Sequence, residues 1–490
     1  MDNLSFLKSG TDIRGTAFSF TNGEYELTNE RVSAITAACA RTFAVKTGKS
    51  VMSFSVGCDS RVSSDRIKSC VTDTLLTLGH TVTDCGMCST PAMFMTTVKL
   101  GCDGAFMITA SHLPAEMNGI KLFTCGGGFD GADIAEILAF ASEHPFEAKC
   151  GLTCEKHAFL SEYASELREM IIKATGSEKP FEYLKIVVDA GSGVGGFYAN
   201  RVLAPLGADT SGSRYLEPNG LFPGHVPNPE NKAAMDSIRE AVIESEADFG
   251  IIFDTDVDRA ACVFSDGSEI NRNRLVALAS YIALKDCPGG TIVTDSVTSD
   301  GLARFIEHDL GGVHRRFKRG YKNVIDESKR LNGEGISSPL AIETSGHAAF
   351  ACNYFLDDGA YLITRILIEL ARRRMAGGRL SDITASLSEP AEEKEIRYKI
   401  ALADFKSYGL SVIEDFKRYT AETDGAVPAS ENYEGLRVSL APELGDGWLL
   451  LRMSLHEPLL VMNCESAVAG GTEKILTWFN KFIGSYGQLS

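Results

Sequence analysis

This 490-residue sequence lacks the marks of a membrane protein or a secreted protein. No apolar run approaches the roughly 18 residues that a membrane-spanning helix needs. Residues 1–10 contain no basic region followed by an apolar stretch, which a secretory signal would have. The sequence also has no short-period repeat and no low-complexity tract. These absences predict a globular protein without a membrane partner.

Basic residues are in short supply. The chain has 48 Lys and Arg against 65 Asp and Glu, which gives a net charge of −17 at pH 7. Such a chain is a poor general binder of nucleic acid or of anionic membranes. An anionic ligand would therefore need positive charge gathered locally. Apolar residues make up 44% and can fill several cores, so a mostly disordered chain is excluded.

The cysteines do not suit a secreted disulfide framework, because their number, 13, is odd and they are scattered along the chain. They fit a reducing cytoplasm better, and we expect a cytoplasmic protein. Cys85 and Cys88 form a CxxC pattern, but no second CxxC completes a zinc site. We interpret this pattern as a turn.

Short apolar runs typical of buried strands alternate with longer helical patterns. The runs lie at residues 51–56, 105–108, 186–188, 249–253 and 291–293, and the helical patterns at 71–78, 234–245, 274–284 and 360–373. This alternation predicts α/β units with mainly parallel sheets. Beyond residue 390, a helical stretch at 402–420 is followed by strand-like runs at 436–440 and 448–451. That change predicts a smaller α+β domain at the C-terminus.

Three carboxylates, those of Asp254, Asp256 and Asp258, directly follow a buried-strand pattern. In extended backbone, side chains at i, i+2 and i+4 point the same way, so we expect these three to converge. Converging carboxylates repel one another unless a cation lies between them, and oxygen ligands suit a hard ion, Mg²⁺ first. An EF-hand is excluded, because Arg259 and Ser265 stand where that motif needs Gly and Glu.

The same triad leaves a second interpretation open. A haloacid-dehalogenase-like phosphatase also places Asp-x-Asp after an apolar run, with Thr or Val at the fifth position, where this chain has Asp258. In that alternative, Asp254 would be the nucleophile of an aspartyl-phosphate phosphatase.

Ser111 and His112 follow another apolar run, and Lys121 lies ten residues after the serine. The G-x-S-x-G elbow of an esterase is absent, because Thr109 and Leu113 occupy its glycine positions. A serine, a lysine and a Mg²⁺ site together indicate phosphoryl transfer. In that chemistry, positioning and charge neutralisation carry most of the catalysis.

Two further motifs carry less information. Residues 191–196 match G-x-G-x-x-G, with an acid at Asp209, but residues 202–208 look like a helix end and a turn rather than the second strand of a dinucleotide site. We interpret the motif as a tight strand-to-helix turn. Glu343 and Ser345 could take hydrogen bonds from neighbouring sugar hydroxyls, although a polar loop at a strand end is the favoured interpretation of this motif alone.

In order and spacing, these segments resemble the α-D-phosphohexomutase family, and most closely its phosphomannomutase/phosphoglucomutase branch. Five loops carry the resemblance: Ser-Gly-Thr-Asp-Ile-Arg-Gly at 9–15, the phosphoserine loop at 109–121, the metal loop at 254–259, the sugar loop at 342–347 and the phosphate loop at 452–458. Segments 57–61 and 223–229 also look like family segments.

The resemblance implies a four-domain fold, with three similar mixed-sheet α/β domains and a smaller α+β domain around a central cleft. We accordingly expect four domains, each with one loop: 1–163 with the phosphoserine loop, 164–268 with the metal-binding loop, 269–388 with the sugar-binding loop and 389–490 with the phosphate-binding loop.

The resemblance also implies an activity, the interconversion of hexose 1-phosphate and hexose 6-phosphate, with glucose, mannose or both as the sugar. Ser111 would rest as phosphoserine, and glucose 1,6-bisphosphate or mannose 1,6-bisphosphate would be the intermediate and activator. One Mg²⁺ per chain would be held by Asp254, Asp256, Asp258 and a phosphate oxygen on Ser111. The partner is a small sugar phosphate, and we expect a monomer or a homodimer.

The remaining roles are also implied by the resemblance. Lys121 is the candidate general base, with Arg14 assisting it, and His112 and Arg259 would place the phosphoryl group and the sugar. The implied substrate-binding residues are Glu343, Ser345, His347, Arg452, Ser454 and His456.

The chain departs from the family pattern at a few positions. The departures are Cys58 for Arg, Leu113 for Asn, Ile342 for Gly, Leu455 for a small residue or Asn, and His456 for Thr. The phosphate loop therefore matches least well, which keeps open a non-catalytic paralogue that only binds sugar phosphate. Phosphoglucosamine mutase is another alternative, although that branch usually carries Gln where this chain has Thr344.

Overall fold

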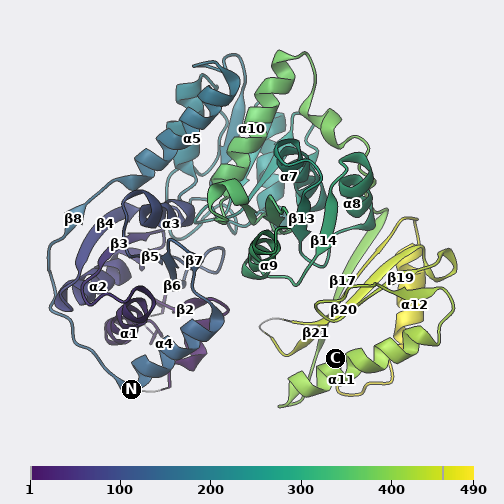
Figure 1. Cartoon of the computed structure of the whole chain (residues 1–490), viewed down its shortest axis with the longest axis horizontal. Helices are drawn as coiled ribbons and strands as arrows, with labels where there is room; N and C mark the ends of the chain where they lie inside the picture. Colours follow the sequence, from purple (N-terminus) through teal and green to yellow (C-terminus); the bar gives the residue numbers. More distant parts are fainter. Residues whose placement is uncertain (1–2, 22, 455–456) are drawn as a thin grey trace. The chain divides into compact units, whose positions relative to one another are not determined.

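The computed structural model describes residues 3–21, 23–454 and 457–490 (Figure 1). The chain forms two compact units. Unit 1 comprises residues 1–271 and 345–382, and unit 2 comprises residues 272–344 and 383–490. None of the helices in the described ranges is long and apolar enough to cross a membrane. The boundaries of the four expected domains stay predictions.

The first sheet of unit 1 is mixed, with the strand order β1-β2-β6-β5-β3-β4-β8 and β7 beside β6. Its strands are β1 (Lys8–Ser9), β2 (Asp12–Thr16), β3 (Ser53–Cys58), β4 (Thr81–Met87), β5 (Gly104–Ile108), β6 (Met117–Thr124), β7 (Gly127–Gly128) and β8 (Glu155–Lys156). β3 is parallel to β4 and β5, whereas β6 is antiparallel to β5 and β2. Four helices belong to this part: α1 (Asn29–Thr47), α2 (Ser64–Thr77), α3 (Thr90–Lys99) and α4 (Gly131–Glu143).

An aromatic cluster fills the core between this sheet and α1. The ring of Phe43, on α1, lies 5.1 Å from that of Phe54 and 5.6 Å from that of Phe106, and all three side chains are fully buried. Phe54 and Phe106 sit on the neighbouring strands β3 and β5. Because both strands are buried on both faces, they appear in the sequence as continuous apolar runs.

The second sheet of unit 1 has the order β12-β11-β10-β9. Its strands are β9 (Ile186–Asp189), β10 (Phe249–Phe253), β11 (Ala260–Phe264) and β12 (Glu269–Ile270). β9 and β10 are parallel, and β10 and β11 form an antiparallel hairpin. The helices here are α5 (Phe159–Thr175), α6 (Lys232–Glu244) and α10 (Gly359–Met375), and β16 (Ala348–Phe350) also belongs to unit 1.

Unit 2 contains a parallel group of strands and a separate antiparallel sheet. In the first, β13 (Thr291–Thr294) lies between β14 (Val313–Arg316) and β15 (Leu340–Ile342). Its helices are α7 (Arg272–Asp286), α8 (Asp300–Arg304) and α9 (Tyr321–Gly333).

The antiparallel sheet of unit 2 has the order β17-β21-β20-β19-β18. Its strands are β17 (Glu392–Lys399), β18 (Ala426–Pro428), β19 (Leu436–Leu440), β20 (Gly447–Met453) and β21 (Leu459–Ser466). It packs against α11 (Phe405–Ala421) and α12 (Gly471–Ile483), and the buried Phe416, Trp478 and Phe479 lie in its core.

The expected α/β architecture with a smaller α+β region at the C-terminus is confirmed. Some helices and strands begin or end at residues other than those predicted, where the terminal turn is mostly polar. For example, α2 begins at Ser64, seven residues before its predicted start, and the buried Ile67, four residues before Val71, already belongs to its apolar face. The sheets are more mixed than the apolar runs predicted, since an antiparallel partner stands beside β5 and beside β10.

Candidate active site

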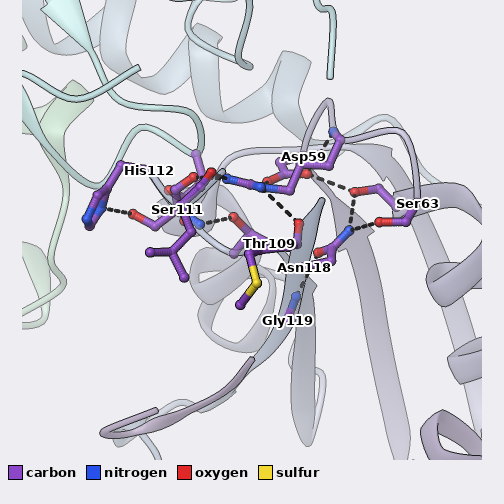
Figure 2. Close-up of polar contacts among 12 residues, drawn as sticks. Asp59, Ser63, Thr109, Ser111, His112, Asn118 and Gly119 are labelled. Carbon is purple, nitrogen blue, oxygen red and sulfur yellow. Dashed lines mark hydrogen bonds and ion pairs between the residues drawn. The ribbon is translucent and has the colours of Figure 1, made fainter. Parts of the chain in front are cut away.

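Ser111 lies in the loop that follows the buried strand β5. Its side chain is buried, and its φ of 52° lies in the left-handed region that residues other than glycine rarely adopt. The backbone N–H of Ser111 donates to Thr109 Oγ1 at 2.9 Å, and the Ser111 hydroxyl lies 3.2 Å from Nδ1 of His112 (Figure 2). Backbone strain of this kind is concentrated at functional sites and persists only when the surrounding contacts hold it.

The guanidinium of Arg61 supplies many of those contacts. It donates to backbone carbonyls of the loop, at 2.6 Å to Pro114, 2.9 Å to Met117 and 2.7 Å to Leu113, and it also reaches the carbonyl of Ser111. Asp59 Oδ2 orients the guanidinium from 3.1 Å. Arg61 was not among the predicted site residues. The signal that could have found it is its place two residues after an acid at the end of a buried strand.

Asn118 and Gly119 join the loop to the neighbouring strand. The Asn118 side-chain amide donates to Ser63 Oγ at 2.9 Å (Figure 2). The Thr109 N–H donates to the Gly119 carbonyl at 3.1 Å. A Cβ at Gly119 would lie 2.4 Å from the carbonyl oxygen of Ile13. A larger residue is therefore excluded where β6 passes β2.

The carboxylates of Asp254, Asp256 and Asp258 converge, but on a turn rather than on extended backbone. Residues 254–259 connect the antiparallel strands β10 and β11, and Val257 has a φ of 67°. The predicted extended geometry was therefore wrong, because a hairpin turn and not strand alternation brings the side chains together. One oxygen atom from each carboxylate lies within 4.8 Å of the others.

The glycine motif at residues 191–196 packs against this turn. A Cβ at Gly193 would lie 2.6 Å from the carbonyl oxygen of Thr255, and the Val194 N–H donates to the same oxygen at 2.8 Å. A Cβ at Gly196 would lie 2.1 Å from the Leu216 carbonyl oxygen. Protein backbone thus fills the space that a dinucleotide would need, in agreement with the interpretation of the motif as a structural turn.

Lys121 brings positive charge to the triad from β6. Its ammonium nitrogen lies 2.9 Å from Asp256 Oδ2 and 2.5 Å from Asp258 Oδ2, and all three side chains are buried. Burial by itself opposes ionisation of Asp258, but the charges of Lys121, His347 and Arg259 outweigh it and lower the pKa of this carboxyl. Asp258 is therefore ionised at physiological pH.

Asp254 is the member of the triad that faces Ser111. The Ser111 hydroxyl donates to Asp254 Oδ2 at 3.1 Å. Burial, and after it repulsion from Asp258 and Asp256, raises the pKa of Asp254 well above its usual value. Such an environment disfavours a third negative charge unless a cation shares the site.

The donor set of the triad fits a hard divalent cation. Two of its oxygen atoms, Oδ1 of Asp256 and Oδ1 of Asp258, are buried and have no hydrogen-bond partner among the described residues. Buried polar atoms are normally satisfied, so these two oxygens need a ligand. All candidate ligand atoms are carboxylate oxygens, which Mg²⁺ and similar ions prefer. The acidic triad is therefore able to hold a metal ion.

Arg14 and Arg259 place positive charge near His112. Burial, together with the charges of Arg259 and Arg14, lowers the pKa of His112 to about 2, so its imidazole is neutral at physiological pH. Arg14 Nη2 lies 2.7 Å from Asp12 Oδ2, and Arg259 Nη1 lies 3.2 Å from Glu230 Oε2.

The segment from residue 345 onward adds His347 and Ser345 to unit 1. His347 Nδ1 lies 3.9 Å from Asp258 Oδ1 and is in direct contact with the Asp357 carboxylate. Burial opposes the charged imidazolium, but Asp357 favours it, and the pKa of His347 is raised. Asp357 was not a predicted site residue. Ser345 Oγ is buried and has no hydrogen-bond partner within the described ranges.

The other predicted substrate-binding residues belong to unit 2. The Gly320 N–H donates to Glu343 Oε1 at 2.6 Å. Arg452 lies on β20 with its side chain only 7% exposed, and Ser454 follows at the end of this strand. Two positions of the predicted phosphate loop, Leu455 and His456, lie outside the described residues. The roles of all these residues stay predictions.

Three models of one family match successive parts of the chain. They are described as phosphoglucomutase/phosphomannomutase, alpha/beta/alpha domain I, domain II and domain III, and they match residues 7–147, 161–267 and 271–390. Together, these ranges span about three quarters of the 490 residues.

Individual relatives agree with this match. A phosphoglucomutase/phosphomannomutase of Thermococcus kodakarensis is 30% identical over 413 residues, which cover 83% of this chain and 84% of that protein. A phosphoglucomutase of Neisseria gonorrhoeae is 29% identical over 444 residues, 90% of each chain. A solved structure from Burkholderia thailandensis, a phosphoglucomutase/phosphomannomutase family protein, superposes with a TM-score of 0.80 at 26% identity over 99% of this chain and 98% of that one. The resemblance seen in the sequence is thus confirmed, and the chain belongs to the phosphoglucomutase/phosphomannomutase family.

Proposed function

We propose that this protein is a phosphohexomutase that interconverts hexose 1-phosphate and hexose 6-phosphate, with glucose, mannose or both as the sugar. Family membership supports a hexose-phosphate mutase. The observation that carries the assignment of residues is the Ser111 hydroxyl, held in strained backbone 3.1 Å from a carboxylate of the acidic triad. A buried hydroxyl beside a candidate metal site suits phosphoryl transfer.

In this proposal, Ser111 rests as a phosphoserine. It gives its phosphoryl group to a hexose monophosphate, so that a P–O bond to Ser111 breaks and one to a sugar hydroxyl forms. The product of that step, a hexose 1,6-bisphosphate, turns around and returns its other phosphoryl group to Ser111. Glucose 1,6-bisphosphate or mannose 1,6-bisphosphate then also acts as the activator that phosphorylates Ser111 in resting enzyme.

The acidic triad would hold one Mg²⁺ through Asp254, Asp256 and Asp258, together with a phosphate oxygen on Ser111. When bound, the ion would supply positive charge next to the transferring phosphoryl group. The two orphaned carboxylate oxygens described above support this assignment. The chain's own contribution is to hold the three carboxylates in one tight turn, so that they need no rearrangement to act together.

Lys121 is the proposed general base, which accepts the proton of the attacking sugar hydroxyl. A lysine must first lose its own proton to do this, so its ammonium needs a lowered pKa. Its present partners, Asp256 and Asp258, are also the proposed metal ligands. A cation between these carboxylates would weaken their hold on the ammonium, which favours its deprotonation. Arg14, on the neighbouring strand β2, is proposed to assist Lys121.

His112 and Arg259 are proposed to place the phosphoryl group. The neutral imidazole of His112 can donate or accept at Nδ1, next to the Ser111 hydroxyl. We assign Glu343, Ser345 and His347 to the sugar hydroxyls. Arg452, Ser454 and His456 are assigned to the phosphate that is not transferred, because an arginine presents a fork that matches two phosphate oxygens.

A coupled mutase assay tests the proposal. Purified protein with Mg²⁺ and a hexose 1,6-bisphosphate should convert glucose 1-phosphate or mannose 1-phosphate, with glucosamine 1-phosphate as the comparison for the phosphoglucosamine alternative. Phosphate trapped in the resting enzyme should be found on Ser111. Phosphate found on Asp254 instead would favour the aspartyl-phosphate alternative, and absence of turnover with every sugar would favour the non-catalytic paralogue.

A further inference from the structure

In unit 2, hydrogen-bond donors and an arginine side chain surround the carboxylate of Glu434. Glu434 lies in the segment that joins β18 to β19, and its side chain is only 12% exposed. The Ser296 hydroxyl donates to Oε1 at 2.5 Å, and the backbone N–H of Arg319 donates to Oε2 at 3.1 Å. Arg452 Nε lies 3.5 Å from Oε1. Two hydrogen-bond donors and one guanidinium thus surround the carboxylate of Glu434.

These donors come from separate segments of unit 2. Ser296 follows β13, Arg319 lies between β14 and α9, and Arg452 is on β20. The residue after Arg319 is Gly320, whose N–H donates to the proposed sugar ligand Glu343. The segment around Arg319 is therefore bonded both to the sugar-binding carboxylate and to the carboxylate beside the phosphate-binding arginine.

The hydrogen bonding of Arg452 is incomplete although its side chain is buried. Its Nε is buried and has no hydrogen-bond partner in the part of the chain that the structure describes, because Glu434 at 3.5 Å is too distant. A buried guanidinium normally has its N–H groups satisfied. The missing partner indicates an acceptor that joins the site from outside.

Carboxylates already neutralise part of the positive charge in this cluster. Arg319 and Arg452 are the cations, and the carboxylates of Glu434, Asp295 and Glu395 act on Arg452, with Asp295 Oδ2 also 3.6 Å from Arg319 Nε. An arriving dianion would therefore meet a site whose positive charge is partly neutralised by Glu434. Removal of that one negative charge should make the site more receptive to a dianion.

We propose that Glu434 is an internal counter-ion that competes with a phosphate monoester for a subsite made by Arg452, Ser296 and the Arg319 backbone. Phosphate takes the guanidinium and the hydroxyl from Glu434, because it carries more charge and more acceptor oxygens than a carboxylate. This competition keeps the affinity of the subsite for phosphate moderate. A bisphosphate intermediate that must dissociate from this subsite and turn around requires moderate affinity. The inference therefore rests on the proposed function.

A different role for Glu434 would give the opposite result. If Glu434 were a brace that orients Arg452, its loss would weaken phosphate binding. If it is a competitor, its neutralisation strengthens binding. The direction of the change therefore decides between the two roles.

The test is calorimetric titration of the full-length, metal-free protein with inorganic phosphate and with glucose 1-phosphate. Glu434→Gln keeps the shape of the side chain and removes its charge. It should lower the dissociation constant for phosphate by at least about fivefold. Glu431→Gln is the matched control, because Glu431 lies in the same segment and pairs with Arg315, 2.6 Å away. This control should bind phosphate as the parent protein does.

Arg452→Ala identifies which part of the phosphate-binding signal comes from this subsite. In the double variant with Glu434→Gln, it should abolish the increase in phosphate affinity. Unchanged or weaker phosphate binding in Glu434→Gln overturns the inference. If that variant does not fold, Ser296→Ala provides the second test: weaker binding supports the subsite, and unchanged binding overturns it. Binding is measured without turnover. If Glu434→Gln binds phosphate more tightly but the protein has no mutase activity, the phosphate subsite is supported and only the proposed function is refuted.

Discussion

The hydroxyl of Ser111 donates to Oδ2 of Asp254 at 3.1 Å, although 143 residues separate the two. This contact joins the loop after β5 to the turn between β10 and β11. Both partners are buried, and Asp254 lies in a turn whose other carboxylates are held by Lys121. The hydroxyl is thereby fixed beside the concentration of negative charge that a cation would neutralise.

Replacement of this hydroxyl should abolish phosphoryl transfer. We expect Ser111→Ala to lower kcat by at least about a thousandfold, as the loss of a nucleophile does in other enzymes. Intact-mass measurement should find no phosphate on the variant. Ser60→Ala, in the neighbouring loop, is the control and should keep both activity and phosphate. Full activity in Ser111→Ala would show that another residue carries the phosphoryl group.

Removal of the Lys121 ammonium should make stability depend on the metal. In Lys121→Met, the carboxylates of Asp256 and Asp258 remain buried without their cationic partner, which should cost about 3–5 kcal/mol of unfolding free energy in chelator. Mg²⁺ should restore much of that loss, since it replaces the missing charge. Thermal unfolding with and without Mg²⁺ measures both effects.

Asp256→Asn is the matched comparison for that experiment, because it removes one of the carboxylates and should weaken Mg²⁺ binding. If Mg²⁺ stabilises Lys121→Met no more than the parent protein, ammonium and metal do not share these carboxylates.

Substitution of Gly193, which packs against the turn that carries the triad, should destabilise that turn. Gly193→Ala places a Cβ 2.6 Å from the Thr255 carbonyl oxygen, and such overpacking typically costs about 1–3 kcal/mol. Because Thr255 lies between Asp254 and Asp256, we expect Mg²⁺ binding to weaken as well. Gly333→Ala is the control, since a Cβ there meets nothing within 4 Å. Denaturant unfolding and Mg²⁺ titration provide the two measurements, and unchanged Mg²⁺ affinity would contradict the role of this turn in metal binding.

Glu465 should make the stability of the chain depend on pH. Burial raises the pKa of Glu465 from its usual 4.5 to about 7, although a hydrogen bond from Trp448 Nε1 at 2.8 Å favours its ionised form. Between these two pH values, the folded chain holds a proton that the unfolded chain has lost. The unfolding free energy therefore falls as pH rises through this window.

The fall attributable to Glu465 should reach about 3–4 kcal/mol at most, because each pKa unit corresponds to about 1.4 kcal/mol. Glu465→Gln should flatten the dependence between pH 4.5 and pH 7, whereas Glu473→Gln, on the exposed side of α12, should leave it unchanged. Denaturant unfolding across this pH range provides the measurement. An identical slope in Glu465→Gln and the parent protein would refute the prediction.

Local sequence signals were sufficient for the buried strands and for the types of residue in the site. β5 and β10 are buried on both faces, so each appears as an unbroken apolar run, and the polar residue that follows marks the strand end. The convergence of Asp254, Asp256 and Asp258 was also predicted, but from the wrong backbone geometry. Alternation describes only extended chain, whereas the turn depends on the positive φ of Val257, which no apolar pattern reveals.

The sequence by itself determined the α/β fold, the family and a short set of candidate residues, because apolar period and motif order are local properties of the chain. Only the tertiary structure decided how those residues are held. The clamp of Arg61 on the Ser111 loop, the pairing of Lys121 with the triad and the donors around Glu434 all join segments that are distant in sequence. Such contacts depend on how sheets and loops pack, and a hydrogen bond needs its partners within about 3 Å, a condition that no local pattern encodes.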